Sequence, residues 1–241
     1  MMSLLELSHV SKWYDQAGER FYAVRDVSLS IEAGEFVAIM GPSGSGKSTM
    51  MHLMGLLDTV DEGEIRMHGI PTSQLTERAL STLRNENIGF VFQSFHLLPR
   101  TSALENVALP LWYAKVPERE AMERAAKALV RVGLNPEEKG RNAPNQLSGG
   151  QQQRVAIARA IVNAPSLILA DEPTGNLDSK ATDDILALFQ SLNAEGTTIV
   201  MVTHEPHVGQ HAKRIIRFRD GRVAADEPVP QPLQAGAGVS V

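Results

Sequence analysis

The sequence feature that most constrains the fold is the segment at 41–49, which reads GPSGSGKST. It fits the phosphate-binding pattern G-x-x-x-x-G-K-[ST] at every fixed position. The apolar run at 35–40 before it suits a buried strand, and residues 47–54 after it have helical spacing. The sequence therefore predicts a strand, a phosphate-binding loop and a helix. A chance Gly/Ser-rich turn is the alternative, and about one sequence in a hundred of this length would contain the pattern by chance.

The residue types in this phosphate loop (residues 41–49) explain its chemistry. Gly44 and Gly46 allow backbone turns that point successive N–H groups into one concavity at the positive end of a helix. Lys47 is placed to reach the β- and γ-phosphates of a nucleotide, and the Ser48 hydroxyl can ligate Mg²⁺. Thr49 is expected to add a hydrogen bond to phosphate. The other members of the predicted nucleotide site are Gly41, Pro42, Ser43 and Ser45.

Composition narrows the class of protein. A chain of 241 residues with 43% hydrophobic residues can bury one substantial core, with room for an inserted lobe. The net charge of −5 argues against nucleic acid as the main ligand. The absence of cysteine removes disulfides and thiolate sites and fits a reducing compartment. We see no secretory signal, and no apolar run approaches the ~20 residues that cross a bilayer, so any membrane spans would come from another chain.

The first part of the chain predicts strands at 4–10 and 24–31, separated by a loop at 12–18. Tyr14 lies in this loop, where an aromatic ring can stack on a base, although simple packing is the alternative. Further strands are predicted at 64–69 and 88–92, with a polar helix at 75–84 between them. The strand at 88–92 stops at Gln93, and a lone Gln at a strand end is usually a surface or turn residue.

Prolines punctuate residues 94–146, which predicts a small helical lobe. Its clearest helix spans 118–132, and the apolar stripe of that helix fits internal packing, with a groove for a partner helix as the alternative. The stripe contains Ala121, Met122, Ala125, Ala126, Leu129 and Val130. After the lobe, Ser148 is suited to cap a helix at 152–162, and the glycines beside it leave backbone N–H groups open. An ordinary cap is favoured there, and a second anion site is the alternative.

Two carboxylates follow the continuously apolar strand at 166–170. Asp171 would hold Mg²⁺ directly or through water, and Glu172 would orient or deprotonate an attacking water. The alternative is a strand that ends in solvated charge. The buried strand at 197–202 ends near His204, at the sheet edge where open α/β folds place their ligands. A metal site formed with His207 and His211 is disfavoured, because the sequence supplies no fourth ligand pattern.

The chain is predicted to end in a helix at 182–192 after Asp178, a hairpin turning at Asp220 and Gly221, and a flexible Pro/Ala/Gly-rich tail from about Asp226.

These motifs follow one another in the same order as in the ATPase subunits of ABC transporters. The chain resembles those subunits over nearly its whole length, up to about residue 223. The phosphate loop is similar to their Walker A motif, Gln93 to the Q-loop, and Leu-Ser-Gly-Gly-Gln at 147–151 to the signature. The strand ending in Asp171 and Glu172 is similar to Walker B. The D-loop and H-loop are matched by Asp178 and His204. The segments at 90–93, 96–99, 101–107 and 170–178 resemble the LolD/MacB branch, which serves lipoprotein release and macrolide or peptide export.

The resemblance implies an α/β P-loop NTPase fold of the ABC-ATPase type. It has a parallel or mixed sheet core, an N-terminal antiparallel β-subdomain and an inserted α-helical lobe. Residues 1–225 would form one ATPase domain, with a RecA-like core at about 1–93 and 147–225 and the helical subdomain at about 94–146. Residues 226–241 would remain a flexible tail.

The resemblance also implies roles for single residues, with ATP and Mg²⁺ as cofactors. Tyr14 would stack on adenine, and Gln93 would contact Mg²⁺ and the attacking water. His204 would contact the γ-phosphate, and Asp178 would link two sites. The signature residues Ser148, Gly149, Gly150 and Gln151 would serve the ATP held by a second copy, with Ser148 and Gly150 at its γ-phosphate. The implied catalytic residues are Glu172, His204, Gln93 and Lys47, and the implied Mg²⁺ contacts are Ser48, Gln93 and Asp171.

The implied function is ATP hydrolysis by a cytoplasmic subunit that forms a head-to-tail dimer. It would sit on the inner face of the cell membrane through a separate permease that contacts the helical lobe. An ATPase that regulates a membrane complex without transport is the alternative. An ATPase acting on DNA or ribosomes would have a long coiled-coil insertion or two fused cassettes, and the sequence contains neither. The cargo and the direction of transport would belong to the membrane subunit.

Overall fold

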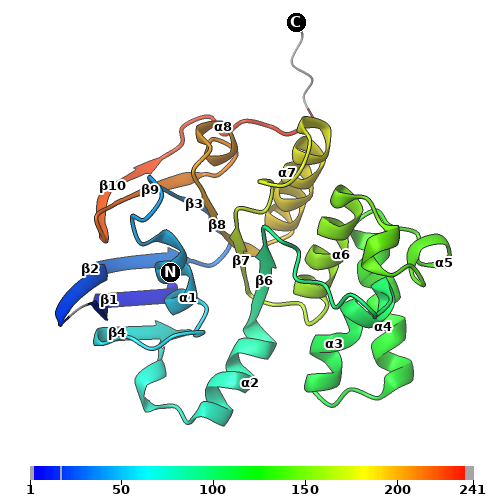
Figure 1. Ribbon diagram of the computed structural model, residues 1–241, viewed down its shortest axis with the longest axis horizontal. Coiled ribbons are helices and arrows are strands. Elements are labelled where there is room, and N and C mark those ends of the chain that lie inside the picture. The colour runs from blue at the N-terminus through cyan, green and yellow to red at the C-terminus, as the bar shows by residue number, and fades with distance from the viewer. Residues whose placement is uncertain (1–2, 17, 237–241) are drawn as a thin grey trace, which may run out of the picture.

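The computed structural model describes residues 3–16 and 18–236, which form two sheets and a lobe of helices (Figure 1). The first sheet is antiparallel, with the strand order β2-β1-β4-β5. Its strands are β1 (Ser3–Gln16), β2 (Glu19–Glu32), β4 (Glu62–Met67) and β5 (Ile70–Pro71).

The second sheet has the order β10-β9-β3-β8-β7-β6. Its strands are β3 (Phe36–Met40), β6 (Ile88–Phe92), β7 (Leu167–Asp171), β8 (Thr198–Thr203), β9 (Arg214–Arg219) and β10 (Arg222–Pro228). All neighbours pair in parallel except β9 and β10, which form the predicted hairpin. Because parallel strands end at one edge, the residues that follow β3, β6, β7 and β8 gather there.

Helices cover the second sheet and build the lobe. Those near the sheets are α1 (Lys47–Met54), α2 (Glu77–Asn87), α6 (Gly149–Ile161), α7 (Ser179–Ala194) and α8 (Pro206–Gly209). The lobe, green in Figure 1, contains α3 (Ala103–Tyr113), α4 (Glu118–Arg131) and α5 (Pro136–Lys139). Short 3₁₀ turns lie at η1 (Thr72–Gln74) and η2 (Pro144–Gln146). The α/β class, the antiparallel N-terminal sheet and the inserted helical lobe predicted from the sequence are thereby confirmed.

Strand β3 shows where the core sits. It is buried along its whole length, and its alternate residues enter two different hydrophobic clusters. Phe36, Ala38 and Met40 pack into the cluster that includes α3, α4, α6 and α7, whereas Val37 and Ile39 pack into the one that includes α1, β1 and β2. This period-two alternation places the second sheet between two apolar layers. Packing on both faces holds the strand ends in place, and the candidate site residues follow those ends.

Strand β1 continues where a loop was predicted. The loop at 12–18 is wrong as far as Gln16, because Lys12, Trp13 and Tyr14 pair with Val24, Tyr22 and Phe21 of β2. Register shifts on both sides of Lys12 interrupt the simple alternation that would have revealed the strand. Ala17 lies outside the described residues.

The C-terminal part also differs from the prediction. Strand β10 runs to Pro228, where a flexible tail was expected from Asp226, because Asp226 pairs with Ile216 and binds Arg214 through two 2.7 Å hydrogen bonds. Val229 and Ala235 then pack on the core, and the Gln190 side-chain amide donates to the Leu233 carbonyl oxygen at 2.6 Å. Residues 237–241 of the predicted tail lie outside the described residues.

Two smaller points complete the fold. Most of the predicted α4 stripe is at least partly buried, but Val130 is 61% exposed and does not belong to it. Across residues 3–16 and 18–236, every helix is too short or too polar to cross a membrane.

Candidate active site

The phosphate loop lies between β3 and α1 and leaves the start of α1 open. Gly44 and Gly46 have φ of 77° and 101°, in the left-handed region that favours glycine. A Cβ on Gly46 would lie 2.1 Å from the Ala23 carbonyl oxygen, so glycine is required there for space as well. Within residues 3–16 and 18–236, no side chain caps this helix end, so its first N–H groups remain available to an anion.

Lys47 and Ser48 line this loop from the first turn of α1. The Lys47 ammonium group is buried and donates to the carbonyl oxygens of Gly41 and Pro42, each at 2.8 Å. Its positive charge therefore lies over the loop concavity, with no carboxylate as a hydrogen-bond partner. The Ser48 hydroxyl is close enough to Asp171, at the end of β7, to lower the pKa of that carboxyl group.

Two carboxylate oxygens beside the loop are buried without a hydrogen-bond partner among the described residues. These are Oδ1 of Asp171 and Oε2 of Glu172. Burial raises the pKa of Asp171 and the neighbouring Glu172 charge raises it further, while His52, the Ser48 hydroxyl and the Lys47 charge oppose this. Buried carboxylates without partners are normally satisfied by a cation, and hard oxygen ligands suit Mg²⁺. The donor set at this point therefore fits a magnesium ion.

Glu172 and His204 form a close pair at the same sheet edge. The Nδ1 of His204 lies 2.6 Å from Oε1 of Glu172, and the backbone N–H of Glu172 donates to the Val202 carbonyl oxygen at 2.9 Å. The Glu172 hydrogen bond and charge raise the pKa of His204. Glu172 has a φ of 47°, a strained conformation for a non-glycine residue.

Gln93 follows β6 and adjoins the turn after Glu172. A Cβ on Gly175 would lie 2.7 Å from Nε2 of Gln93, so glycine lets the two segments meet. The Asn176 side-chain amide donates to the Gln93 carbonyl oxygen at 3.0 Å. Gln93 thus belongs to the same cluster of strand ends as Glu172. A lone Gln did not indicate this by itself, whereas the family resemblance assigned Gln93 to the site.

Tyr14 stands beside α1 on strand β1, with its side chain partly exposed. Its hydroxyl donates to Oδ2 of Asp58 at 3.2 Å. Lys12 donates to Oδ1 of Asp58 at 2.9 Å, and its ammonium lies 5.7 Å from the centre of the Tyr14 ring. Burial and the Asp58 charge raise the pKa of Tyr14, so the phenol is neutral at pH 7 and offers an uncharged stacking surface next to the loop. No sequence pattern indicated that Asp58 lies near the nucleotide site.

The signature segment (residues 148–151) lies at the start of α6, where Ser148 and Gln151 form a capping box. The Ser148 hydroxyl accepts from the Gln151 backbone N–H at 3.3 Å, and the Gln151 side-chain carbonyl accepts from the Ser148 N–H at 3.0 Å. Asp178 caps α7 next to it by accepting from the Ala181 N–H at 2.8 Å. The segment lines a cavity of about 360 Å³ that includes no phosphate-loop residue. Within one chain, the structure does not bring the two anion-suited helix ends together.

The remaining site candidates form no metal cluster. His207 and His211 contact each other edge to face with ring centroids 5.2 Å apart. Among the described residues, no group of three or more His, Cys, Asp or Glu side chains is arranged to hold a metal ion.

Fold and site together define a nucleotide-binding α/β protein of the phosphate-loop class. The profile of the ABC transporter family matches residues 24–175, and the chain belongs to this family. It is 51% identical over 220 residues to the "uncharacterized ABC transporter ATP-binding protein YknY" of Bacillus subtilis, covering 91% of this chain and 95% of that one. It is 46% identical over its full length to the "macrolide export ATP-binding/permease protein MacB" of Aggregatibacter actinomycetemcomitans, but spans only 37% of that protein.

A solved structure supports the same assignment. The chain is similar to the ATP-binding cassette MJ0796 in a dimeric post-hydrolysis state with ADP and Pi, with 46% identity and a TM-score of 0.86. The match covers 94% of this chain and 99% of MJ0796. The chain is therefore an ATP-hydrolysing cassette of an ABC transporter, with the fold and LolD/MacB-type relatives expected from its sequence.

Proposed function

We propose that this chain is the ATP-driven subunit of an exporter of the lipoprotein-release or macrolide and peptide type, and that two copies close head to tail around ATP. One observation carries this proposal. The chain has an open phosphate loop and a separate signature segment at the surface, and they do not meet in one copy. A second copy, turned head to tail, would supply the missing half of each site. The dimeric state named for MJ0796 supports this arrangement.

In the proposed site the phosphate loop holds the triphosphate and Tyr14 stacks on adenine. Lys47 moves from its loop carbonyls to the β- and γ-phosphates, where its charge is better satisfied. Ser48, Asp171 and Gln93 would hold Mg²⁺, and the bound ion would neutralise charge on the phosphate oxygens. Ser148 and Gly150 of the other copy contact the γ-phosphate, and Asp178 lies where it links the two sites.

Hydrolysis follows from the strand-end cluster. Glu172 orients a water molecule and accepts its proton as the water oxygen attacks the γ-phosphorus. The bond between the γ-phosphorus and the β–γ bridging oxygen breaks, which leaves ADP and inorganic phosphate. His204, held by Glu172 at 2.6 Å, hydrogen-bonds the γ-phosphate as negative charge shifts during the reaction. Positioning and charge stabilisation supply most of the rate, as in phosphoryl transfer generally.

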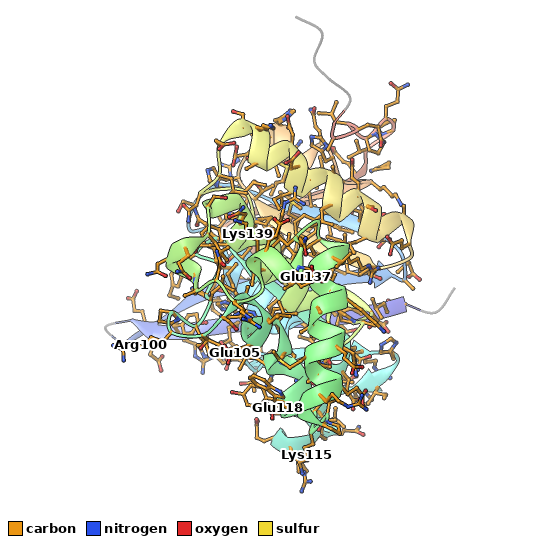
Figure 2. The ribbon with its side chains drawn as sticks, turned by 90° about the vertical axis from the view of Figure 1, so that its right-hand side faces the viewer. Arg100, Glu105, Lys115, Glu118, Glu137 and Lys139 are labelled. Atoms are coloured by element: carbon orange, nitrogen blue, oxygen red, sulfur yellow. The ribbon has the colours of Figure 1, made fainter. Side chains whose placement is uncertain are left out.

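The proposed permease contact is the edge of the helical lobe that faces α2. A groove of about 880 Å³ lies there between α2, β6, α3 and α6. Its lining includes Leu57, which is 46% exposed, and Tyr113, which is 80% exposed. Charged residues line part of this groove, among them Arg78, Glu86 and Arg159, beside apolar ones such as Phe90 and Leu109. The outer face of the lobe carries charges of both signs, labelled in Figure 2 as Arg100, Glu105, Lys115, Glu118, Glu137 and Lys139, of which Lys115 also lines the groove. The groove is therefore a better docking site than the outer face for an apolar segment of a membrane protein.

The relatives support a membrane partner. MacB of Aggregatibacter actinomycetemcomitans is named as an ATP-binding and permease protein, and this chain matches 37% of its length. We infer that a permease supplies the corresponding function here and holds this chain at the inner face of the membrane. Purification in mild detergent, followed by mass spectrometry of bound membrane proteins, tests this inference. A chain that hydrolyses ATP at full rate and retains no membrane protein would contradict it.

The enzymatic proposal is tested with Glu172→Gln. This variant should still bind ATP, because the phosphate loop is unchanged, but should lose at least about a hundredfold in turnover with its general base. It should accumulate as an ATP-bound dimer in gel filtration. The control is Glu205→Gln, which changes a neighbouring carboxylate in the same way and should turn over ATP normally. Wild-type turnover by Glu172→Gln without a dimer would remove Glu172 from its role.

A further inference from the structure

Gln153 is a fully buried polar side chain on α6, beyond the signature segment. Its side-chain Nε2 donates to the Pro173 carbonyl oxygen at 2.6 Å, across 20 residues of sequence. Its Oε1 is buried with no hydrogen-bond partner among the described residues. Neighbouring positions Val155 and Ile157 belong to the apolar core, so the amide is an exception within its surroundings.

Stability alone does not account for an amide at this position. A buried polar atom without a partner is unfavourable, and replacing both partners of a buried hydrogen bond by apolar groups of the same shape is often close to neutral. Met would fill a similar volume and would remove the unsatisfied Oε1, but it would leave the Pro173 carbonyl oxygen without its donor. The role of Gln153 therefore depends on the hydrogen bond that its side-chain N–H group donates.

This hydrogen bond restrains the turn that contains Glu172, because its acceptor is the carbonyl oxygen of Pro173. Pro173 follows directly after Glu172 and has no backbone N–H, so its carbonyl oxygen is its only hydrogen-bonding group. Glu172 adopts a φ of 47°, and such a conformation persists only where its surroundings restrain it. The turn is tied to itself by the Gly175 N–H and to β8 by the Glu172 N–H, at 3.1 and 2.9 Å. Gln153 adds a restraint from a helix.

The same helix begins with the residues that serve the second copy in the proposed dimer. The backbone at Gly149 and Gly150 also packs against the segment that follows this turn. A Cβ on Gly149 would lie 3.6 Å from Leu177 Cδ2, and one on Gly150 would lie 3.3 Å from the Cβ of Ala181 in the first turn of α7. We propose that Gln153 is a positioning residue that holds the Glu172 turn against α6, so that contact of the signature segment with ATP in the other copy is transmitted to this copy's own catalytic carboxylate. The proposal rests on the role of Glu172 given above.

The direct test is Gln153→Met, which keeps the volume and removes the donor. We expect kcat to fall about tenfold, because a small misplacement of a catalytic group is enough for such a loss, while KM and the Kd for ATP stay within twofold. The matched control is Gln152→Met, since Gln152 donates at 3.1 Å to Leu147 and not to the Glu172 turn. Its kcat should remain within twofold of wild type. An unchanged kcat for Gln153→Met would overturn the proposal.

A double variant separates positioning from a general structural role. Because Gln153 acts through Glu172, adding Gln153→Met to Glu172→Gln should not lower the residual single-turnover rate any further. A further tenfold loss in that background would show that Gln153 acts elsewhere and would overturn the proposal. Full turnover by Glu172→Gln alone would instead reject the role of Glu172, which keeps the two failures distinguishable.

Gln153→Glu provides a rescue. A buried carboxyl group stays protonated to higher pH and can donate its O–H to the Pro173 carbonyl oxygen. Relative to wild type, kcat of this variant should be near normal at pH 6 and should fall as the pH rises and the carboxyl ionises. A ratio to wild type that stays low and constant across the pH range would contradict the proposal. This measurement also replaces the Met variant if that variant does not fold.

Discussion

The starts of α1 and α6 are both helix N-termini with glycines close by, before α1 and in the first turn of α6, yet their first N–H groups are treated differently. The α1 end has no side-chain cap and places Lys47 over its own open N–H groups. The α6 end has a complete capping box between Ser148 and Gln151 and lies at the surface. Both carry the same helix dipole. The difference shows that two helix N-termini with the same dipole can be finished differently by local sequence, one left open beside a lysine and the other capped by its own side chains.

The largest expected effect comes from the α1 end. Lys47→Ala removes the charge that the loop keeps over its concavity, and affinity for ATP should fall at least about a hundredfold, given about 1.5–3 kcal/mol for each hydrogen bond to a charged group. Titration calorimetry measures this. Lys127→Ala, an exposed lysine on α4, is the control and should bind normally. Unchanged affinity of Lys47→Ala would contradict the assignment of the nucleotide site.

A smaller and different effect is expected at the α6 end. Ser148→Ala should leave ATP affinity of the isolated chain unchanged and lower turnover about tenfold, while the lost cap costs about 1 kcal/mol of stability. Mixing this variant with Lys47→Ala sharpens the comparison, because a mixed dimer contains one site with both an intact loop and an intact signature. Recovery of turnover above both parents is expected. No recovery would mean that the two ends do not belong to different copies.

The smallest expected effect concerns pH. Glu172 raises the pKa of His204 above its usual value near 6.5, so their pairing stabilises the fold fully below that value and is lost as the pH rises through the raised pKa. Because the His204 side chain is 62% exposed, the change in stability should be small, and NMR titration is the better measurement. The pKa of His204 should drop in Glu172→Gln. The pKa of His211, which burial lowers, should stay unchanged as an internal control.

Much of this molecule could be predicted from sequence because its signals are local. The phosphate loop is fixed by glycine conformations and by one lysine at a set spacing, and the strand that ends in Asp171 is a plain apolar run. Tyr14 was predicted in a loop because register shifts hide the continuation of β1, and the β10 boundary was missed because pairing with β9 outweighs its polar composition. Gln153 could not be found, since its partner lies 20 residues away and only the fold joins them.

The left-handed backbone at Glu172 has a consequence for protein engineering. A non-glycine residue held at φ 47° stores on the order of 1–3 kcal/mol, and Gly or Asn would occupy that conformation more easily. Libraries of this chain screened only for heat resistance should therefore enrich such replacements at position 172 and discard hydrolysis along the way. Thermostable variants of this cassette are best selected while ATP turnover is assayed in parallel.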